Sequence, residues 1–98
     1  FNNGGSLPSF LTGSASLNFG TGLSGGKGAT EDLTITVTGV VTNDPVLMSM
    51  DRNVGLSSDG VMYHAFCSGT NTVTIRAENM TDGLPDPDAG IFKVYVFK

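Results

Sequence analysis

The chain has little charge, one histidine, one cysteine and no tryptophan, and each shortage narrows what it can do. Charged residues make up 14% of its 98 residues and hydrophobic residues 39%, so much of the surface must be uncharged. Cys67 is the only cysteine, which excludes an intrachain disulfide and a cysteine-based zinc site. Stability must then come from packing or from association with other chains.

The distribution of charged and apolar residues argues against two kinds of partner. The net charge is −4 and the five basic residues are spread along the chain, which predicts no nucleic-acid partner. No apolar run approaches the roughly 20 residues of a membrane-spanning helix, which predicts no membrane partner. The length fits a single domain with one small core.

What the chain has in abundance is Gly, Thr and Ser, arranged as short alternating segments between turns. Fourteen glycines count against long helices. In Glu31–Gly39, Leu33, Ile35 and Val37 alternate with threonines, as in a half-buried strand. The predicted strands are Ala15–Phe19, Glu31–Gly39, Val46–Met50, Val61–Cys67, Thr72–Glu78 and Ile91–Phe97.

The pattern predicts an all-β fold, an antiparallel β-sandwich of immunoglobulin-like or jelly-roll-like type with six to seven strands and no helix. Val61–Cys67 is apolar on both sides, which predicts a central strand, and it should form a hairpin with Thr72–Glu78. The predicted centre of the core is Leu33, Ile35, Val37, Val73 and Ile75.

The first fourteen residues differ from the rest. Residues 1–14 have no sustained period and mix turn formers with isolated apolar residues, which predicts an extended N-terminal arm ahead of a single sandwich domain at 15–98. Extended, the arm would reach roughly 46 to 50 Å, enough to cross to a neighbouring subunit. Its expected partner-binding residues are Leu7, Phe10 and Leu11; a frayed terminus is the alternative.

The residues that could carry chemistry favour structural roles. His64 lies within a predicted strand and no nucleophile-elbow motif is present, so a packed or hydrogen-bonded histidine is expected and no catalytic residue is assigned. Cys67 is expected to be a small buried hydrophobe. Gly20–Gly28 resembles a phosphate loop only superficially, because Lys27 is followed by glycine and no helix-forming segment follows. No cofactor is predicted.

The acidic loop between the last two predicted strands has two interpretations. Asp82, Asp86 and Asp88 could bind calcium, but prolines interrupt the EF-hand spacing and no Glu closes the loop, which favours a solvated turn and no metal. Asn79–Thr81 matches a glycosylation sequon, a pattern short enough to arise by chance.

Several motifs, taken in order, resemble a group of small bacteriophage virion proteins. Near the C-terminus these are a strand of N-T-V-T-V-R type, an Asn-x-Thr, a D-P-x-x-G turn and a final alternating strand, here within Asn71–Val96. The segments Leu33–Gly39, Asn43–Val46 and Tyr63–Ser68 are also similar, so the likeness covers about residues 15 to 98. The Cys67 to Gly69 region departs from the group's commoner V-S-A-A run.

The resemblance implies a β-sandwich on the phage particle, often trimeric, and no enzymatic activity. The expected function is that of a structural virion protein on the capsid surface, decorating or cementing the capsid by binding the major capsid protein. The alternative is a receptor- or carbohydrate-binding knob of a phage fibre, with the acidic loop Asp82–Gly90 at its contact surface. The scarcity of aromatic platforms for sugar, with no Trp, weighs against that alternative.

Overall fold

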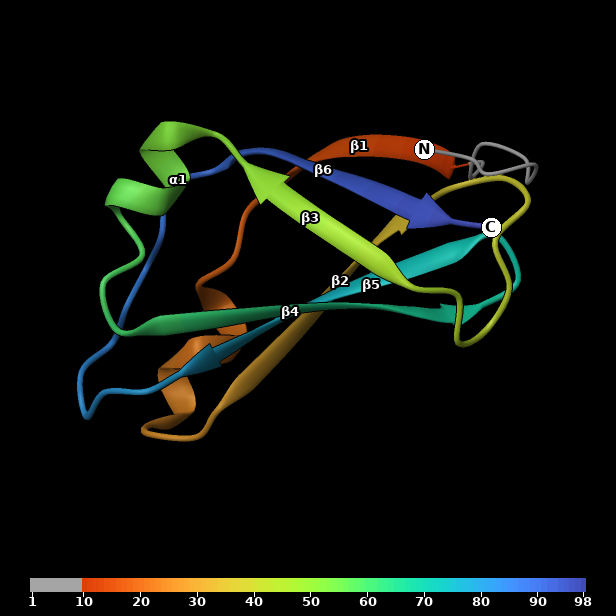
Figure 1. The fold of residues 1–98 in the computed structure, drawn as a ribbon. Helices are drawn as coiled ribbons and strands as arrows, with labels where there is room; N and C mark the ends of the chain where they lie inside the picture. The colour runs from red at the N-terminus through yellow and green to blue at the C-terminus, as the bar shows by residue number, and fades with distance from the viewer. Residues whose placement is uncertain (1–9) are drawn as a thin grey trace, which may run out of the picture.

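The computed structural model describes residues 10–98 and is built from short strands joined by turns (Figure 1). The strands are β1 Phe10–Leu17, β2 Thr30–Thr36, β3 Val46–Met50, β4 Val61–Gly69, β5 Thr72–Asn79 and β6 Gly90–Phe97. The helical turns are the 3-10 turn η1 Thr21–Gly25 and α1 Arg52–Leu56. The predicted all-β class is confirmed, whereas the expectation of no helix is wrong at these two turns.

Two three-stranded antiparallel sheets pack together as a sandwich (Figure 1). One sheet has the order β1-β6-β3 and the other the order β2-β5-β4. The first and last strands are neighbours, with Phe10 opposite Phe97 and Leu17 opposite Gly90. The predicted hairpin is also confirmed, since β4 and β5 pair along their length with a bulge between Cys67 and Gly69.

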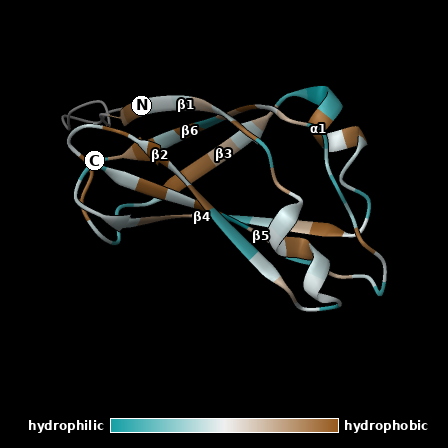
Figure 2. Cartoon of the chain, turned by 180° about the vertical axis from the view of Figure 1, so that it is seen from behind, coloured by the Kyte–Doolittle hydropathy of each residue, from teal (hydrophilic) through white to brown (hydrophobic). Residues whose placement is uncertain are grey.

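The core lies between the two central strands. On β5 the fully buried apolar residues are Val73, Ile75 and Ala77, and on β6 they are Phe92, Val94 and Val96. Ile35 and Val37 join the same cluster and Leu33 packs against it, so the alternation in the sequence identified the inward faces correctly. Figure 2 shows apolar residues recurring along the strands that meet there.

The prediction that Val61–Cys67 is a central strand is wrong. This segment lies in β4, an edge strand, and β5 occupies the middle of its sheet. Only one side of β4 faces the core, and Met62, His64 and Phe66 are exposed on the other. An apolar residue on the outer face of a strand cannot be told from a buried one by alternation alone.

The helical turns each bury one apolar side chain within a segment predicted as a loop. Leu23 of η1 and Val54 of α1 are fully buried and belong to the core cluster. The glycine-rich turn around Leu23 is held by the carboxylate of Glu31 on β2. Its Oε1 accepts the backbone N–H groups of Gly20 at 2.8 Å and Gly22 at 3.1 Å.

The predicted N-terminal arm overlaps the sandwich. Residues 1–9 lie outside the described residues, but Phe10–Ser14 form the first part of β1 and pair with β6. A glycine is required in the middle of this strand. A Cβ built on Gly13 would lie 2.6 Å from Cγ2 of Val37 and 3.2 Å from the carbonyl oxygen of Thr36, so β1 comes close to the end of β2.

The two faces of the β2-β5-β4 sheet should respond differently to truncation of a side chain. Ile75→Ala removes a fully buried residue and should lower the free energy of unfolding by roughly 2 to 5 kcal/mol through transfer loss and cavity formation. Thr36→Ala, at an exposed position of β2, should cost far less. Chemical denaturation of both variants measures the difference; equal destabilisation would contradict the assignment of faces.

Two truncations should separate the terminal segment from β1. Removing residues 1–9 keeps β1 whole and should leave a cooperatively folded domain. Removing residues 1–14 deletes the first five of the eight residues of β1 and uncovers β6, so it should strongly lower the thermal midpoint. If the two truncated chains melt at the same temperature, β1 contributes nothing to the fold.

Candidate interaction surfaces

The outer face of the β1-β6-β3 sheet has a cluster of exposed apolar side chains. Phe10 is 55% exposed, Leu47 61% and Phe97 37%, and Tyr95 lies among them. The ring of Phe10 is 6.4 Å from that of Tyr95 and 6.3 Å from that of Phe97, centroid to centroid. We call Phe10, Leu47, Tyr95 and Phe97 the aromatic face.

The register explains how the aromatic face forms from three strands. Phe10 lies opposite Phe97, and in the next row Tyr95 of β6 lies between Thr12 of β1 and Leu47 of β3. Lys93 is the only charged side chain on the outer side of these three strands, flanked by two serines. The sequence shows these residues as isolated apolar positions; only strand pairing brings them together.

The three residues expected to bind a partner have different positions. Phe10 is part of the aromatic face, and Leu7 lies outside the described residues. Leu11 alternates with Phe10 and therefore faces the other way, where it packs against the core. The sequence pattern did not predict Leu47, Tyr95 and Phe97 at this surface, because it does not distinguish them from the buried residues of the same apolar strands.

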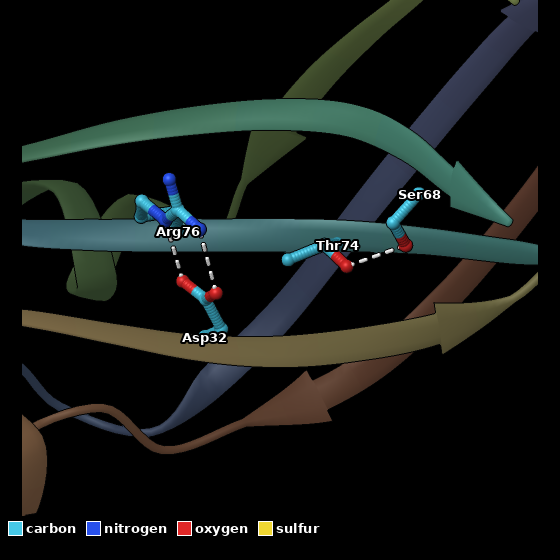
Figure 3. Close-up of polar contacts among 4 residues, drawn as sticks. All are labelled: Asp32, Ser68, Thr74 and Arg76. Atoms are coloured by element: carbon cyan, nitrogen blue, oxygen red, sulfur yellow. Dashed lines mark hydrogen bonds and ion pairs between the residues drawn. The ribbon is translucent and has the colours of Figure 1, made fainter. Parts of the chain in front are cut away.

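The outer face of the other sheet is polar and centres on Arg76 of β5 (Figure 3). Its Nε and Nη2 atoms donate to the two carboxylate oxygens of Asp32 on β2, at 2.8 and 2.9 Å. Its guanidinium lies over the ring of Phe66 on β4, 5.2 Å from the centroid. His64 completes the row opposite Arg76. We call Asp32, His64, Phe66 and Arg76 the ion-pair face.

The ion pair favours the charged forms of Asp32 and Arg76. The Arg76 guanidinium holds the pKa of Asp32 below its ordinary value, chiefly through the side-chain hydrogen bond, and Asp32 raises the pKa of Arg76. Both side chains are more than 40% exposed, so solvent screens the pair and it adds little to stability. A second polar link on the same face joins the hydroxyls of Ser68 and Thr74 at 2.7 Å (Figure 3).

His64 and Cys67, the two residues that could carry chemistry, lie in different environments. His64 is exposed on the ion-pair face, so the expectation of a packed histidine is wrong; it points away from the core because its neighbours in β4, Tyr63 and Ala65, face inward. Cys67 is buried and free, as predicted. Burial raises the pKa of its thiol, and the negative charge of Asp44 adds to that shift.

The acidic loop before β6 has no cluster of metal ligands. Nowhere in residues 10–98 do three His, Cys, Asp or Glu side chains lie close enough together to hold a metal ion. Asp86 instead packs closely against Gly20, and the backbone N–H of Asp88 donates to Ser57 Oγ at 2.8 Å. These contacts tie Asp86 and the backbone of Asp88 to other parts of the fold.

Asn79 of the sequon is a buried structural residue. Its side-chain nitrogen donates to the carbonyl oxygens of Leu23 at 2.9 Å and Gly83 at 3.0 Å, and its Oδ1 accepts from the backbone and hydroxyl of Thr81. These bonds join the η1 turn to the acidic loop, and the side chain is fully buried in the folded chain.

The ion pair on the exposed face can be tested by titration. In NMR titrations the carboxyl of Asp32 should have a pKa below its ordinary value, and in Arg76→Gln that pKa should rise. Because the lowered pKa belongs to the folded state, the stabilising contribution is present above the unfolded pKa and is lost as the pH falls through the folded one.

Asp44 provides an internal control in the same spectra. Its pKa is lowered by the hydrogen bond from Lys98, on a different part of the molecule, and should not change in Arg76→Gln. An Asp32 pKa that is the same with and without Arg76 would contradict the ion pair.

Comparison of the chain with protein-family models, with curated proteins and with solved structures finds no match. Neither helical turn in residues 10–98 has the length and apolar character needed to cross a membrane.

Proposed function

We propose that this chain is a structural protein of a bacteriophage virion that decorates or cements the capsid by binding the major capsid protein. The order of motifs from about residue 15 to residue 98 suggests the virion. The observation that carries the binding role is the aromatic face, where three aromatic rings and Leu47 are grouped on one side of a sheet.

The composition of the aromatic face fits a protein partner. The centres of protein interfaces are rich in Tyr, Phe and other large apolar residues and poor in charge, and this face has one charged side chain, Lys93. Phe and Tyr have few rotatable bonds, so ordering them on binding costs little conformational entropy. The serine and threonine side chains beside them can hydrogen-bond to the partner at the edge of the contact.

The position of the face also suits a cement protein. It lies on a sheet whose inner side is the core, so Tyr95 and Phe97 are held by the same strand that buries Phe92, Val94 and Val96. A surface fixed in this way changes little on binding, which favours affinity.

A receptor- or carbohydrate-binding knob is the second candidate, and the ion-pair face favours it. Asp32 occupies Nε and one Nη2 hydrogen of Arg76, and within the described part of the chain no hydrogen bond uses Nη1. Its free N–H groups and the adjacent His64 would present polar contacts to a sugar or an acidic ligand. The resemblance to virion proteins includes both roles.

Two lysine substitutions distinguish the faces. Leu47→Lys places a charge in the aromatic face and should weaken binding of the purified chain to empty capsids of the encoding phage by about tenfold or more, the scale of losing a central apolar contact. Met62→Lys changes an exposed apolar residue on the opposite sheet, next to Glu78, and should bind as the unmodified chain does.

Electron microscopy of the capsids provides the direct readout. Added density over the capsid lattice with the unmodified chain and with Met62→Lys, but reduced density with Leu47→Lys, would support the proposal. Absence of density with the unmodified chain would contradict the capsid role. Loss of binding with Met62→Lys alone would indicate that the capsid contacts the ion-pair face and not the aromatic face.

A further inference from the structure

The outer edge of β1 is an unpaired strand edge within residues 10–98. β1 pairs with β6 on one side, and no other strand of the described chain pairs with it. Its residues make no backbone hydrogen bond to any other segment of that region. An antiparallel edge strand therefore presents alternating N–H and C=O groups that another strand could bind.

The other three edges of the sandwich each have a feature that discourages pairing, and β1 has none. β2 contains Glu31 and Asp32, β3 has only five residues, and β4 has a bulge between Cys67 and Gly69. Charges, short length and bulges are the usual ways in which proteins protect edge strands. β1 has eight residues, an unbroken register and no charge.

We propose that β1 pairs antiparallel with β1 of a second copy of this chain, about a two-fold axis at Gly13. This would join two three-stranded sheets into one six-stranded sheet with the order β3-β6-β1-β1-β6-β3. Such a contact uses the same surface of both copies, as two-fold dimers do. Phe10 belongs both to this contact and to the aromatic face, but the pairing can be tested without the capsid.

The side chains select the position of the axis. Residues that lie opposite each other must point to the same face, so the axis passes through a residue and not between two. The longest overlap of the two strands places it at one of the middle residues of β1, Gly13 or Ser14. An axis at Gly13 places Phe10 opposite Ser16 of the second copy, and Ser16 is flanked by Ile91 on β6. Phe10 is 55% exposed and Ile91 42%.

In this register the exposed apolar residues meet across the interface. The span from β1 of one copy to β6 of the other is about 10 Å, two strand spacings, and Phe and Ile side chains together bridge it over the small Ser16. The contact occurs twice because of the symmetry. An axis at Ser14 would instead place Phe10 opposite Asn18, beyond the end of the strand.

Charge favours pairing of two copies through β1 over pairing through β2. The chain has a net charge of −4, so a contact between two copies is least opposed where acidic side chains are absent. Pairing through β2 would bring two sets of Glu31 and Asp32 together. Pairing through β1 places only hydroxyl, glycine and apolar side chains opposite one another, with Thr12 facing Ser14 of the second copy.

Two double variants test the proposal with matched charges. Thr12→Glu/Ser14→Glu puts glutamates directly opposite glutamates across the axis, while Lys93 remains beside position 14 within each chain. Leu47→Glu/Ser49→Glu puts the same two charges in the same two rows, beside Tyr95 and Lys93, but on the far side of β6. All four positions are exposed, so both variants should fold.

Sedimentation equilibrium over micromolar to millimolar concentrations provides the measurement, with circular dichroism as a check on folding. The unmodified chain and Leu47→Glu/Ser49→Glu should be dimers, and Thr12→Glu/Ser14→Glu should raise the dimer dissociation constant by about tenfold or more, as expected for opposed like charges. Amide exchange on the unmodified chain gives a second readout, since protection of β1 should increase with concentration.

Other outcomes would overturn the two-fold pairing. The first is an unmodified chain that is monomeric at every concentration. The second is a dimer whose dissociation constant does not change in Thr12→Glu/Ser14→Glu, and the third is a dissociation constant that both variants raise equally. A closed trimer, as the resemblance to virion proteins implies, would also exclude it, because a strand paired with its own copy cannot close a three-membered ring.

Discussion

The contact between the inner faces of β5 and β6 is the interaction on which the rest of the structure depends. Each is the middle strand of its sheet, and together they contribute six fully buried apolar side chains. Burying a Val, Ile or Phe side chain is worth roughly 1.5 to 3 kcal/mol, and no disulfide supplements this packing because Cys67 is free. The flanking strands have their registers set by pairing with these two.

The ends of this core are covered by two helical turns and a buried asparagine, which the alternation of apolar residues does not predict. Leu23 and Val54 enter from single helical turns, and Asn79 joins the first of these turns to the acidic loop through buried hydrogen bonds. Each turn is short, so its position depends on the side chain that it buries and not on its own stability. A small sandwich can thus close its ends without long helices.

The two outer faces inherit their chemistry from the same alternation that builds the core. Every inward residue of a strand has outward neighbours. Apart from Lys93, the outward residues of β1, β3 and β6 are apolar or hydroxylic, whereas those of β2, β4 and β5 include the Asp32–Arg76 pair. One sandwich therefore presents an apolar surface and a charged one.

Side-chain alternation predicted the all-β class, the approximate positions of five strands and the centre of the core, whereas the first strand is Phe10–Leu17 and not the predicted Ala15–Phe19. Alternation of Leu33, Ile35 and Val37 with threonines left only one face to bury, and the Val46–Met50 strand has the bounds that its sequence predicted. The burial of Cys67 was also predictable from its place at the end of an apolar strand. These are local properties, set by side-chain period and turn residues.

Three features depend on contacts between distant segments: which strands are central, where β1 begins and which apolar residues remain at the surface. β4 reads as more buried than β5, yet it is the edge strand because pairing order depends on contacts between distant segments. Phe10 looks like part of an arm, yet it lies opposite Phe97, 87 residues later in the chain. The aromatic face exists only through such pairings, and a one-dimensional pattern does not encode which strands become neighbours.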